Sequence, residues 1–386
     1  MTDSTEPMRV APTRSGLLQQ AALPMLFLLL GVVYASWAAR IPAIRDALAL
    51  NSAQLGIVLL SSGIGAVSSF PLAAWLIRKR GGRKSAWLTG LVLLASLPAL
   101  SLVPGFETLL LAAVVYGAAS SSFDVAINAI GADVEKLAGR SIMSALHAWF
   151  CVGTVSGALI GSGLAGMGLD PVTHFAAIAL LLSVPLYLSY ASLDRDDLDP
   201  HGAKRSFAIP HGPAVVLGVI CFSGAVAEGS VADWSGVFMK DQLGVGDGIA
   251  PLGFAGFAAM MLVARLVGDR LKDRFGARRV ICAGALLAAA GIFIAVPALN
   301  TVTTIFGFSI AGAGMAALFP FVYSAAARYG STALAAVATF GYSGNLIGPP
   351  IIGFVAHGWG LQMSLALLGA LCLFIAAAAS RARALG

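Results

Sequence analysis

The sequence predicts an all-α membrane protein with twelve transmembrane helices in two six-helix bundles related by pseudo-symmetry, and three observations support this fold class. Of its 386 residues, 58% are hydrophobic and only 11% are charged, whereas soluble globular chains carry about 25% charged residues. Its apolar runs are long enough to span a membrane, since about 20 apolar residues cross the hydrocarbon core. The two halves of the chain also repeat one another, which indicates a duplicated bundle.

Twelve apolar runs follow a short polar N-terminal segment. The first run lacks a clear cleavage site, so we expect it to be retained as a span and not removed as a signal peptide. The predicted spans are 19–43, 53–77, 85–103, 107–134, 141–165, 172–192, 213–239, 250–271, 280–299, 302–326, 332–356 and 361–380. The predicted domains are a disordered tail at 1–18, a bundle at 19–192, a cytoplasmic linker at 193–212 and a bundle at 213–386.

The repeat has an offset of about 195 residues, which is the separation of Gly81 and Gly276 (276 − 81 = 195). At the same offset, the Arg-Asp pair at 45–46 is echoed by the Lys-Asp pair at 240–241. A parallel duplication places a solute site near the midplane, between the two bundles. Small-residue faces predict close helix packing in both halves, and they comprise Gly153, Gly157 and Gly161 in one span and Gly344, Gly348 and Gly353 in another.

The charged residues predict topology and exclude several functions. The net charge is +6, but Lys and Arg gather in short segments between spans, which is a membrane-orientation signal and argues against nucleic acid. This bias places both termini on the cytoplasmic side of the membrane and leaves only Arg40, Arg45 and Lys240 outside. The four cysteines have no metal-ligand spacing, and no catalytic constellation is visible. We therefore expect no cofactor, no metal and no enzyme activity.

The segment 265–279 is dense in charge between two apolar runs, which predicts a tight cytoplasmic loop. It resembles the loop motif Gly-x-x-x-Asp-Arg-x-Gly-x-Arg-Arg of major facilitator superfamily transporters. The matching residues are Asp273, Arg274, Gly276, Arg278 and Arg279, while Asp269 takes the place of the leading glycine. The resemblance implies alternating access, and we interpret this loop as a conformational latch in which Arg265 has helical ion-pair spacing to Asp269.

In the span at 107–134, Asp124 and Asn128 lie four residues apart and therefore on one helical face. A charge at the centre of a span costs about 2.5–3.5 kcal/mol on insertion scales, so it is kept where it is paired, hydrated or functional. The surrounding segment resembles that of fucose-permease-like proton symporters, which implies a proton site at Asp124 and a polar contact at Asn128. The alternative is an acid satisfied by serines in a helix interface. His147 is expected at a similar depth, as a proton relay or as a packed histidine.

The span at 213–239 carries two further acids, Glu228 near its middle and Asp233 closer to the outside. An unpaired buried acid at mid-span is implausible, so we expect Glu228 to face a cavity. Arg40 stands at a depth similar to that of Asp233 in the equivalent span of the first half. We therefore predict an Arg40–Asp233 outer gate, with Arg40 reaching out to the membrane surface as the alternative.

Several polar and aromatic side chains lie in spans that are expected to line the cavity. Aromatic faces with a few polar groups suit sugars or other small amphipathic solutes, although they suit a lipid-facing belt equally well. Asn345 is an amide in a glycine-rich apolar helix, so it needs a partner. The candidates are Tyr34, Trp37, Trp234, Tyr323 and Asn345.

The predicted function is secondary active transport by a monomer in the lipid bilayer. The resemblance extends over the whole chain and points to a bacterial branch near the fucose permeases, which implies proton-coupled uptake of a small polar or sugar-like solute. A proton-driven exporter of amphipathic compounds is the second hypothesis. A receptor or scaffold is a third, although the short loops and the linker leave no room for a signalling domain.

Overall fold

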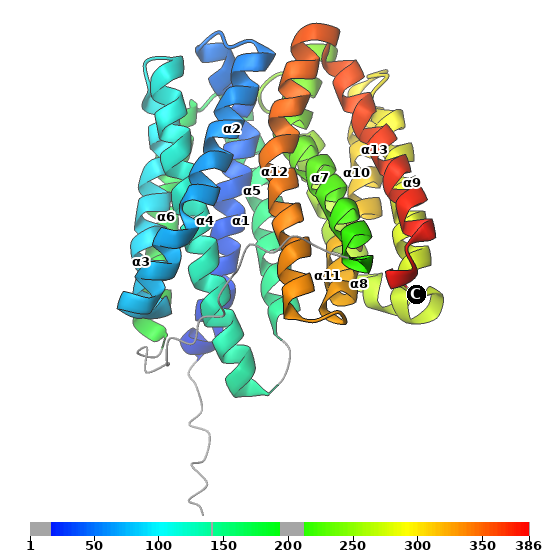
Figure 1. Cartoon of the computed structure of the whole chain (residues 1–386). Helices are drawn as coiled ribbons and strands as arrows, with labels where there is room; N and C mark the ends of the chain where they lie inside the picture. Colours follow the sequence, from blue (N-terminus) through cyan, green and yellow to red (C-terminus); the bar gives the residue numbers. More distant parts are fainter. Residues whose placement is uncertain (1–16, 140–141, 194–211, 386) are drawn as a thin grey trace, which may run out of the picture.

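The computed structural model describes residues 17–139, 142–193 and 212–385, and within these ranges every regular element is a helix. The predicted tail (1–18) and linker (193–212) lie almost wholly outside the described residues. The first helix begins, and the last one ends, on the side of the molecule that is lower in Figure 1. This side is called the terminal face, and the opposite side the far face.

Six helices of the first half pack among themselves. Helix α1 packs against α5 and α6, α3 against α4 and α6, and α2 against α4. Their bounds are α1 Leu17–Ala47, α2 Ser52–Ser68, α3 Phe70–Leu102, α4 Phe106–Ala138, α5 Met143–Gly166 and α6 Pro171–Ser192.

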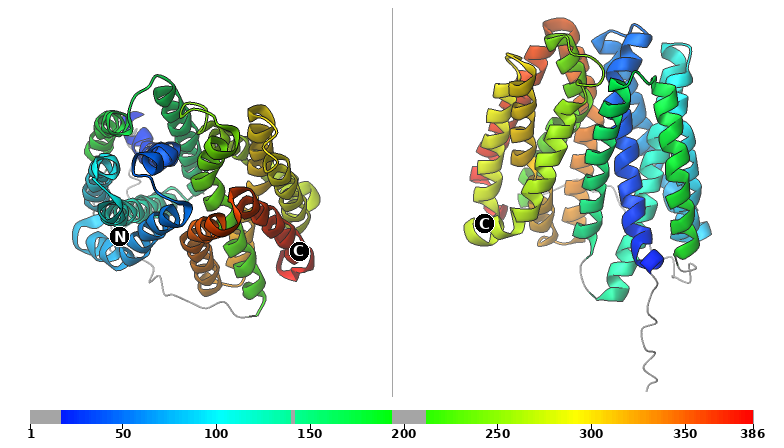
Figure 2. Two further views of the ribbon diagram at one scale, coloured as in Figure 1. Left: turned by 90° about the horizontal axis from the view of Figure 1, so that it is seen from above. Right: turned by 180° about the vertical axis from the view of Figure 1, so that it is seen from behind.

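The helices of the second half form another group beside the first (Figure 2). Helix α7 packs against α12 and α13, α10 against α8 and α9, and α9 against α13. Their bounds are α7 Pro213–Leu243, α8 Leu252–Phe275, α9 Ala277–Ala295, α10 Thr301–Met315, α11 Leu318–Ala327, α12 Ser331–Trp359, α13 Leu361–Arg381 and the 3-10 helix η1 Arg383–Leu385.

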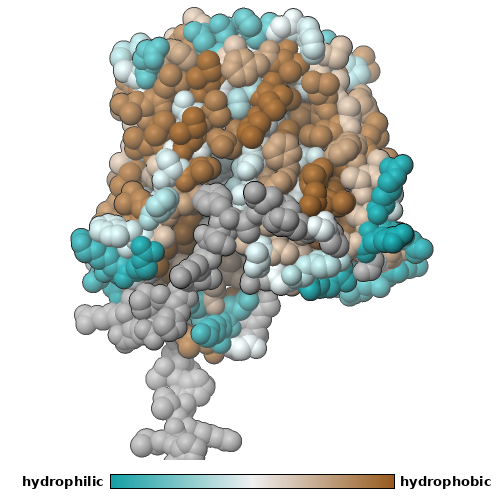
Figure 3. All heavy atoms as spheres, in the orientation of Figure 1, coloured by the Kyte–Doolittle hydropathy of each residue, from teal (hydrophilic) through white to brown (hydrophobic). Residues whose placement is uncertain are grey.

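The surface is that of a membrane protein. Hydrophobic side chains cover the middle of the face seen in Figure 3, and hydrophilic side chains gather toward its two ends. Ten helical segments of the described chain are long and apolar enough to cross a membrane. In α1 and α7, 72% of the most apolar window is buried, against 28% to 56% in the other eight. These two helices therefore occupy the interior of the assembly.

The span count differs from the twelve predicted for identifiable reasons. The segment Ser52–Leu102 is one of the ten but contains two predicted spans, 53–77 and 85–103, which follow one another across a kink at the non-helical residue Gly81. Helices α10 and α11 together make another of the ten, Thr301–Ala327, which corresponds to the single predicted span 302–326 and does not change the count. Helix α12, with 29 residues, is not among the ten, because its polar residues and two internal prolines lower its mean hydropathy.

Gly81 and Gly276 show that the repeat extends to backbone conformation. Both have φ of 79°, with ψ of 165° and 150° respectively. Such left-handed conformations end helices and favour glycine, which has no Cβ to clash with the backbone. The chain therefore makes the same turn after its second span and after α8.

The predicted small-residue faces do pack closely. A Cβ on Gly153 would lie 2.2 Å from the carbonyl oxygen of Leu28 in α1, and one on Gly344 would lie 2.4 Å from that of Phe222 in α7. Gly353 is different because it also faces the other half, where α12 meets α2. A Cβ there would lie 2.7 Å from the carbonyl oxygen of Ser52 and 2.8 Å from the Cα of Gly56.

Gly353→Ala is therefore expected to weaken contact between the two halves at the far face. Overpacking against backbone costs about 1–3 kcal/mol, and the helices relieve it by separating. We expect faster labelling of Cys151, in a variant lacking the other three cysteines, by an impermeant thiol reagent added from the far-face side. Gly358→Ala is the matched control, because a Cβ at Gly358 meets nothing within 4 Å. Equal labelling rates in the two variants would contradict the prediction.

Candidate functional site

A layer of polar side chains lies between the two groups of helices, near the middle of the molecule. Glu228 is at the centre of α7, Asn345 at the centre of α12, and Tyr34 and Arg265 just past the centres of α1 and α8. Because these helices cross the molecule from face to face, their midpoints lie at similar depth. Together with Cys151 of α5, these four residues are called the central cluster.

Glu228 is half-buried, and its Oε2 atom is buried without a hydrogen-bond partner. The positive charge of Arg265 acts on this carboxyl group. The described ion pairs all lie among Arg45, Asp46, Lys240, Asp241 and Asp247, so Glu228 and Arg265 are not in salt-bridge contact. A carboxylate oxygen that is buried without a partner is costly. A proton-carrying or ligand-binding role for Glu228 stays a prediction.

Arg265 corrects a prediction made from spacing alone. Its Nη1 atom contacts Sγ of Cys151 on α5, and its Nε atom is buried without a partner. Asp269, four residues later, is exposed, and the predicted Arg265–Asp269 ion pair is not formed. The reason is depth: Asp269 lies one turn closer to the terminal face, where water can solvate it, while Arg265 reaches across to the other half.

The remainder of the predicted conformational loop lies at the terminal-face end of α8. Asp273 and Arg274 are exposed, and Gly276 ends the helix. The loop is held to α11 by Lys272, whose Nζ lies 3.4 Å from Oγ of Ser324. A conformational role for these residues stays a prediction.

Asp124 and Asn128 share a helical face, as predicted. Nδ2 of Asn128 donates to Oδ1 of Asp124 at 2.8 Å and to its carbonyl oxygen at 2.9 Å. Both residues are half-buried. His147 is exposed, and its ring packs edge-on against Phe27 with 5.4 Å between ring centroids. Proton exchange by Asp124 and relay by His147 stay predictions.

Asp233 lies one and a half turns beyond Glu228 toward the far face. Its charge acts on the hydroxyl groups of Tyr34 and Tyr116, and the Tyr116 hydroxyl is buried without a hydrogen-bond partner. Sequence reasoning missed Tyr116, because a tyrosine inside an apolar span carries no signal of its own.

Arg40 does not pair with Asp233, so the predicted gate is wrong. Arg40 is only 2% exposed; its Nε donates to Nδ1 of His174 at 3.0 Å, and its Nη2 donates to the Leu169 carbonyl at 2.9 Å. It therefore points toward α6 of its own half, where a neutral imidazole and a free carbonyl accept its hydrogen bonds. The alternative of an arginine reaching the surface is also excluded by this burial.

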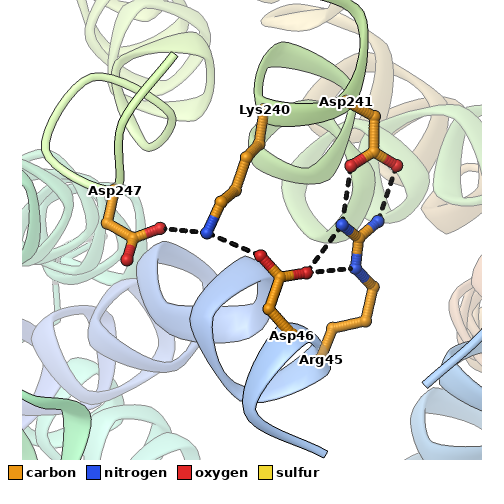
Figure 4. A network of polar contacts seen from close by, with 5 residues as sticks. All are labelled: Arg45, Asp46, Lys240, Asp241 and Asp247. Atoms are coloured by element: carbon orange, nitrogen blue, oxygen red, sulfur yellow. Dashed lines mark hydrogen bonds and ion pairs between the residues drawn. The ribbon is translucent and has the colours of Figure 1, made fainter. Parts of the chain in front are cut away.

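The actual cross-half ion pairs lie further along, at the far-face ends of α1 and α7 (Figure 4). Arg45 makes two contacts of 2.6 Å with the carboxylate of Asp241. Lys240 contacts Asp46 at 2.6 Å and Asp247 at 2.5 Å. These five residues, Arg45, Asp46, Lys240, Asp241 and Asp247, are called the far-face network.

The far-face network is reciprocal. The basic residue of each repeated pair contacts the acid of the other, Arg45 with Asp241 and Lys240 with Asp46. Pseudo-two-fold symmetry produces this arrangement, because a basic-acidic dipeptide placed near the axis meets its own copy. The repeat at 45–46 and 240–241 was the sequence signal that could have identified the network.

An open depression of about 580 Å³ lies over the far-face network, lined by residues that include Arg45, Asp46, Asn51, Asp241 and His357. Glu228 and Asp241 are separated by 13 residues of α7 (241 − 228 = 13), which is about 20 Å of helix at 1.5 Å per residue. The depression is therefore separate from the central cluster.

The predicted aromatic candidates divide into two sets. Trp37 is 4% exposed and packs against Tyr116, while Trp234 is fully buried and donates from Nε1 to the Pro349 carbonyl at 3.0 Å. The structure places both in helix packing and not at an opening. Tyr323 is half-buried, and its hydroxyl group and the thiol of Cys221 both lie beside Gly341.

Tyr34 and Asn345 are the two predicted candidates that belong to the central cluster. Tyr34 is half-buried between Phe150 and Phe254, with ring-centroid distances of 6.4 and 6.1 Å. Asn345 is exposed, and its Oδ1 lies beside Gly229, 2.9 Å from where a Cβ would stand. Within the described residues, no group of three or more His, Cys, Asp or Glu side chains is arranged to hold a metal.

Comparison with known proteins gives consistent matches. The family model described as Major Facilitator Superfamily matches residues 22–330, and again 235–384. An uncharacterized MFS-type transporter of Yersinia pestis is 36% identical over 94% of this chain and 96% of its own. The membrane protein MosC of Rhizobium meliloti is 30% identical over 92% and 88%.

Solved structures show the same fold. The nucleoside transporter NupG superposes with a TM-score of 0.73 at 16% identity, covering 94% of this chain and 98% of its own. A bacterial homologue of the human lysosomal transporter Spinster gives 0.76 at 18% identity, covering 97% and 98%.

Proposed function

Since this chain belongs to the major facilitator superfamily and is a membrane transporter, we propose that it couples uptake of a small polar or sugar-like solute to protons. Glu228 and Asp124 exchange the protons, and the solute binds at the central cluster. The observation that carries this proposal is the buried Oε2 atom of Glu228, which lacks a partner at the middle of α7.

The proposal includes an orientation. Both termini lie on the cytoplasmic side of a bacterial inner membrane, so the far face is the outer face. The contacts between α1 and α7 and between α2 and α12 then close the outer side of the passage. Alternating access requires these contacts to part while others form toward the terminal face. The protein acts as a monomer in this scheme, because the passage lies between two halves of one chain.

The test is counterflow into proteoliposomes that contain the purified protein. Neutral sugars, sugar acids and nucleosides serve as the panel of solutes, each measured with a pH gradient imposed and then collapsed by a protonophore. We expect one or more solutes to accumulate only while the pH gradient is maintained. Solute exchange that is indifferent to the gradient would remove the proton coupling.

A proton-driven exporter of amphipathic compounds is the second candidate. The aromatic rings around Tyr34, from Phe150 and Phe254, favour it, because they offer an apolar surface beside the acids. An exporter predicts substrate efflux against a gradient and wider drug sensitivity in a strain that lacks the gene. Accumulation of a sugar-like solute without these effects would select the uptake proposal.

A further inference from the structure

Arg265 carries a charge deep in the protein without a fully satisfied side chain. It lies ten residues before the end of α8 (275 − 265 = 10), which is about 15 Å of helix from the terminal face. Its guanidinium group contacts the thiol of Cys151, a weak hydrogen-bond acceptor, and its Nε atom has no partner. Arg265 is half-buried, and a cation at this depth with a buried, unpartnered donor is stabilised by a counter-charge.

Glu228 does not supply that counter-charge by direct contact. The two charges act on each other, yet neither takes part in a described salt bridge. Each of the two side chains retains a buried polar atom without a partner, Oε2 in Glu228 and Nε in Arg265. A solute with an acidic group toward Arg265 and a donor toward Glu228 would satisfy both atoms.

Arg265 lies where binding of a solute would change a contact between the two halves of the chain. It belongs to α8 in the second half, while Cys151 belongs to α5 in the first. An anion bound by the guanidinium would replace the weak thiol contact by a charge-assisted bond, which is roughly twice as strong as a neutral one. Such a bond changes what holds α5 and α8 together.

We propose that Arg265 binds an anionic group of the transported solute, so that the substrate class is a small organic acid, such as a sugar acid. This inference rests on the proposed transport function. It moves Arg265 from the conformational loop to the solute site. Glu228 then lies within electrostatic reach of the bound acid, where its protonation removes a like-charge repulsion.

The test uses Cys151 as a reporter beside Arg265. In a variant whose other cysteines are alanine, Cys151 is labelled with an anionic sulfonatoethyl and a cationic trimethylammonioethyl methanethiosulfonate. The ratio of the two rates, divided by the same ratio for 2-mercaptoethanol, cancels the intrinsic reactivity of the thiol. Cys151 is 4% exposed, so labelling reports openings of the space between the halves.

We expect the normalised ratio to favour the anionic reagent by about tenfold, given the size of charge interactions at partly buried sites. Arg265→Gln should lower the ratio by about tenfold, Arg265→Lys should keep it, and Glu228→Gln should raise it. These last two variants keep the test decisive if Arg265→Gln does not fold. The inference would be overturned if neither Arg265→Gln nor Glu228→Gln changed the normalised ratio. It would also be overturned if Cys151 did not react with either reagent.

Counterflow with the same preparation separates this inference from the proposed function. Proton-coupled transport of a neutral solute, with a labelling ratio that ignores Arg265, would leave the function in place and remove the anion site. A labelling ratio that favours the anionic reagent, together with transport that is not coupled to protons, would keep the anion site and remove the proton-coupled function.

Discussion

Glu228→Gln is expected to abolish proton-driven accumulation of solute while leaving solute exchange intact. Glutamine has the same shape and still donates and accepts hydrogen bonds, but it cannot take up or release a proton. The Oε2 atom of Glu228 is buried without a partner, so its ionised form is strongly disfavoured unless a ligand or water reaches it. The cycle therefore loses its proton-carrying step and keeps its solute-carrying step.

The measurement is the accumulation ratio in proteoliposomes under a pH gradient of one unit. One pH unit corresponds to about 1.4 kcal/mol per proton, so one coupled proton supports up to about tenfold accumulation. The Glu228→Gln protein should reach a ratio of about one, with counterflow retained. Glu107→Gln is the matched control, because Glu107 is an exposed acid in the first turn of α4.

Asp124→Asn shows whether the coupling needs both acids. Asp124 accepts a hydrogen bond from Asn128, so its carboxyl group is held in place in a way that Glu228 is not. We expect weaker but measurable accumulation in this variant. Full accumulation in the Glu228→Gln protein would show that Glu228 is not a proton carrier in this cycle.

Reversing one charge of the far-face network is expected to open the far face, and reversing its partner as well should close it again. Arg45 and Asp241 form a two-point contact between α1 and α7, and their side chains are only 12% and 33% exposed. Isolated exposed pairs contribute about 0.2–1 kcal/mol, whereas two-point pairs within a network contribute more. We expect each single variant, Arg45→Asp or Asp241→Arg, to favour the open state by about 1–2 kcal/mol.

Labelling of Cys151 from the far-face side measures this equilibrium. A change of one or two kcal/mol corresponds to a roughly five- to thirtyfold change in the open population, so each single variant should label faster by that factor. The double variant, in which the charges are exchanged, should return close to the original rate. A double variant that labels as fast as either single one would disprove the pairing.

Asp170→Asn provides a control that removes one charge at the far face but outside the far-face network. Asp170 also lies at the far face, where it caps the start of α6 and accepts hydrogen bonds from the Thr173 hydroxyl at 2.7 Å and the Thr173 amide at 2.9 Å. These bonds lower the pKa of its carboxyl group below the ordinary value, so it is charged at neutral pH. Asparagine keeps the cap and removes the charge without touching α7, and labelling should not change.

The sequence predicted the fold well because its signals are local or periodic. Apolar run length, the loop at 265–279 and the repeat at 195 residues depend on composition and spacing, and the matching conformations of Gly81 and Gly276 follow from the same repeat. The shared face of Asp124 and Asn128 was equally predictable, because helical geometry alone places residues four apart together.

Partners between distant segments were not predictable in the same way. Arg40 and Asp233 have similar depth, but depth does not specify rotation about the helix axis, and Arg40 turns toward His174. Arg265 has ideal spacing to Asp269, yet it reaches Cys151, because a group facing the other half can contact residues that spacing does not reveal.

By itself, the sequence determined that this chain spans the membrane repeatedly, that its halves are copies, and that acids remain within its spans. These properties follow from the cost of placing polar groups in hydrocarbon, which each segment meets on its own. Only the tertiary structure decided which charges meet across the two halves, because rotation and contact of whole helices are collective results of packing. The far-face network and the contact of Arg265 with Cys151 are the two consequences of that packing on which the proposed transport cycle depends.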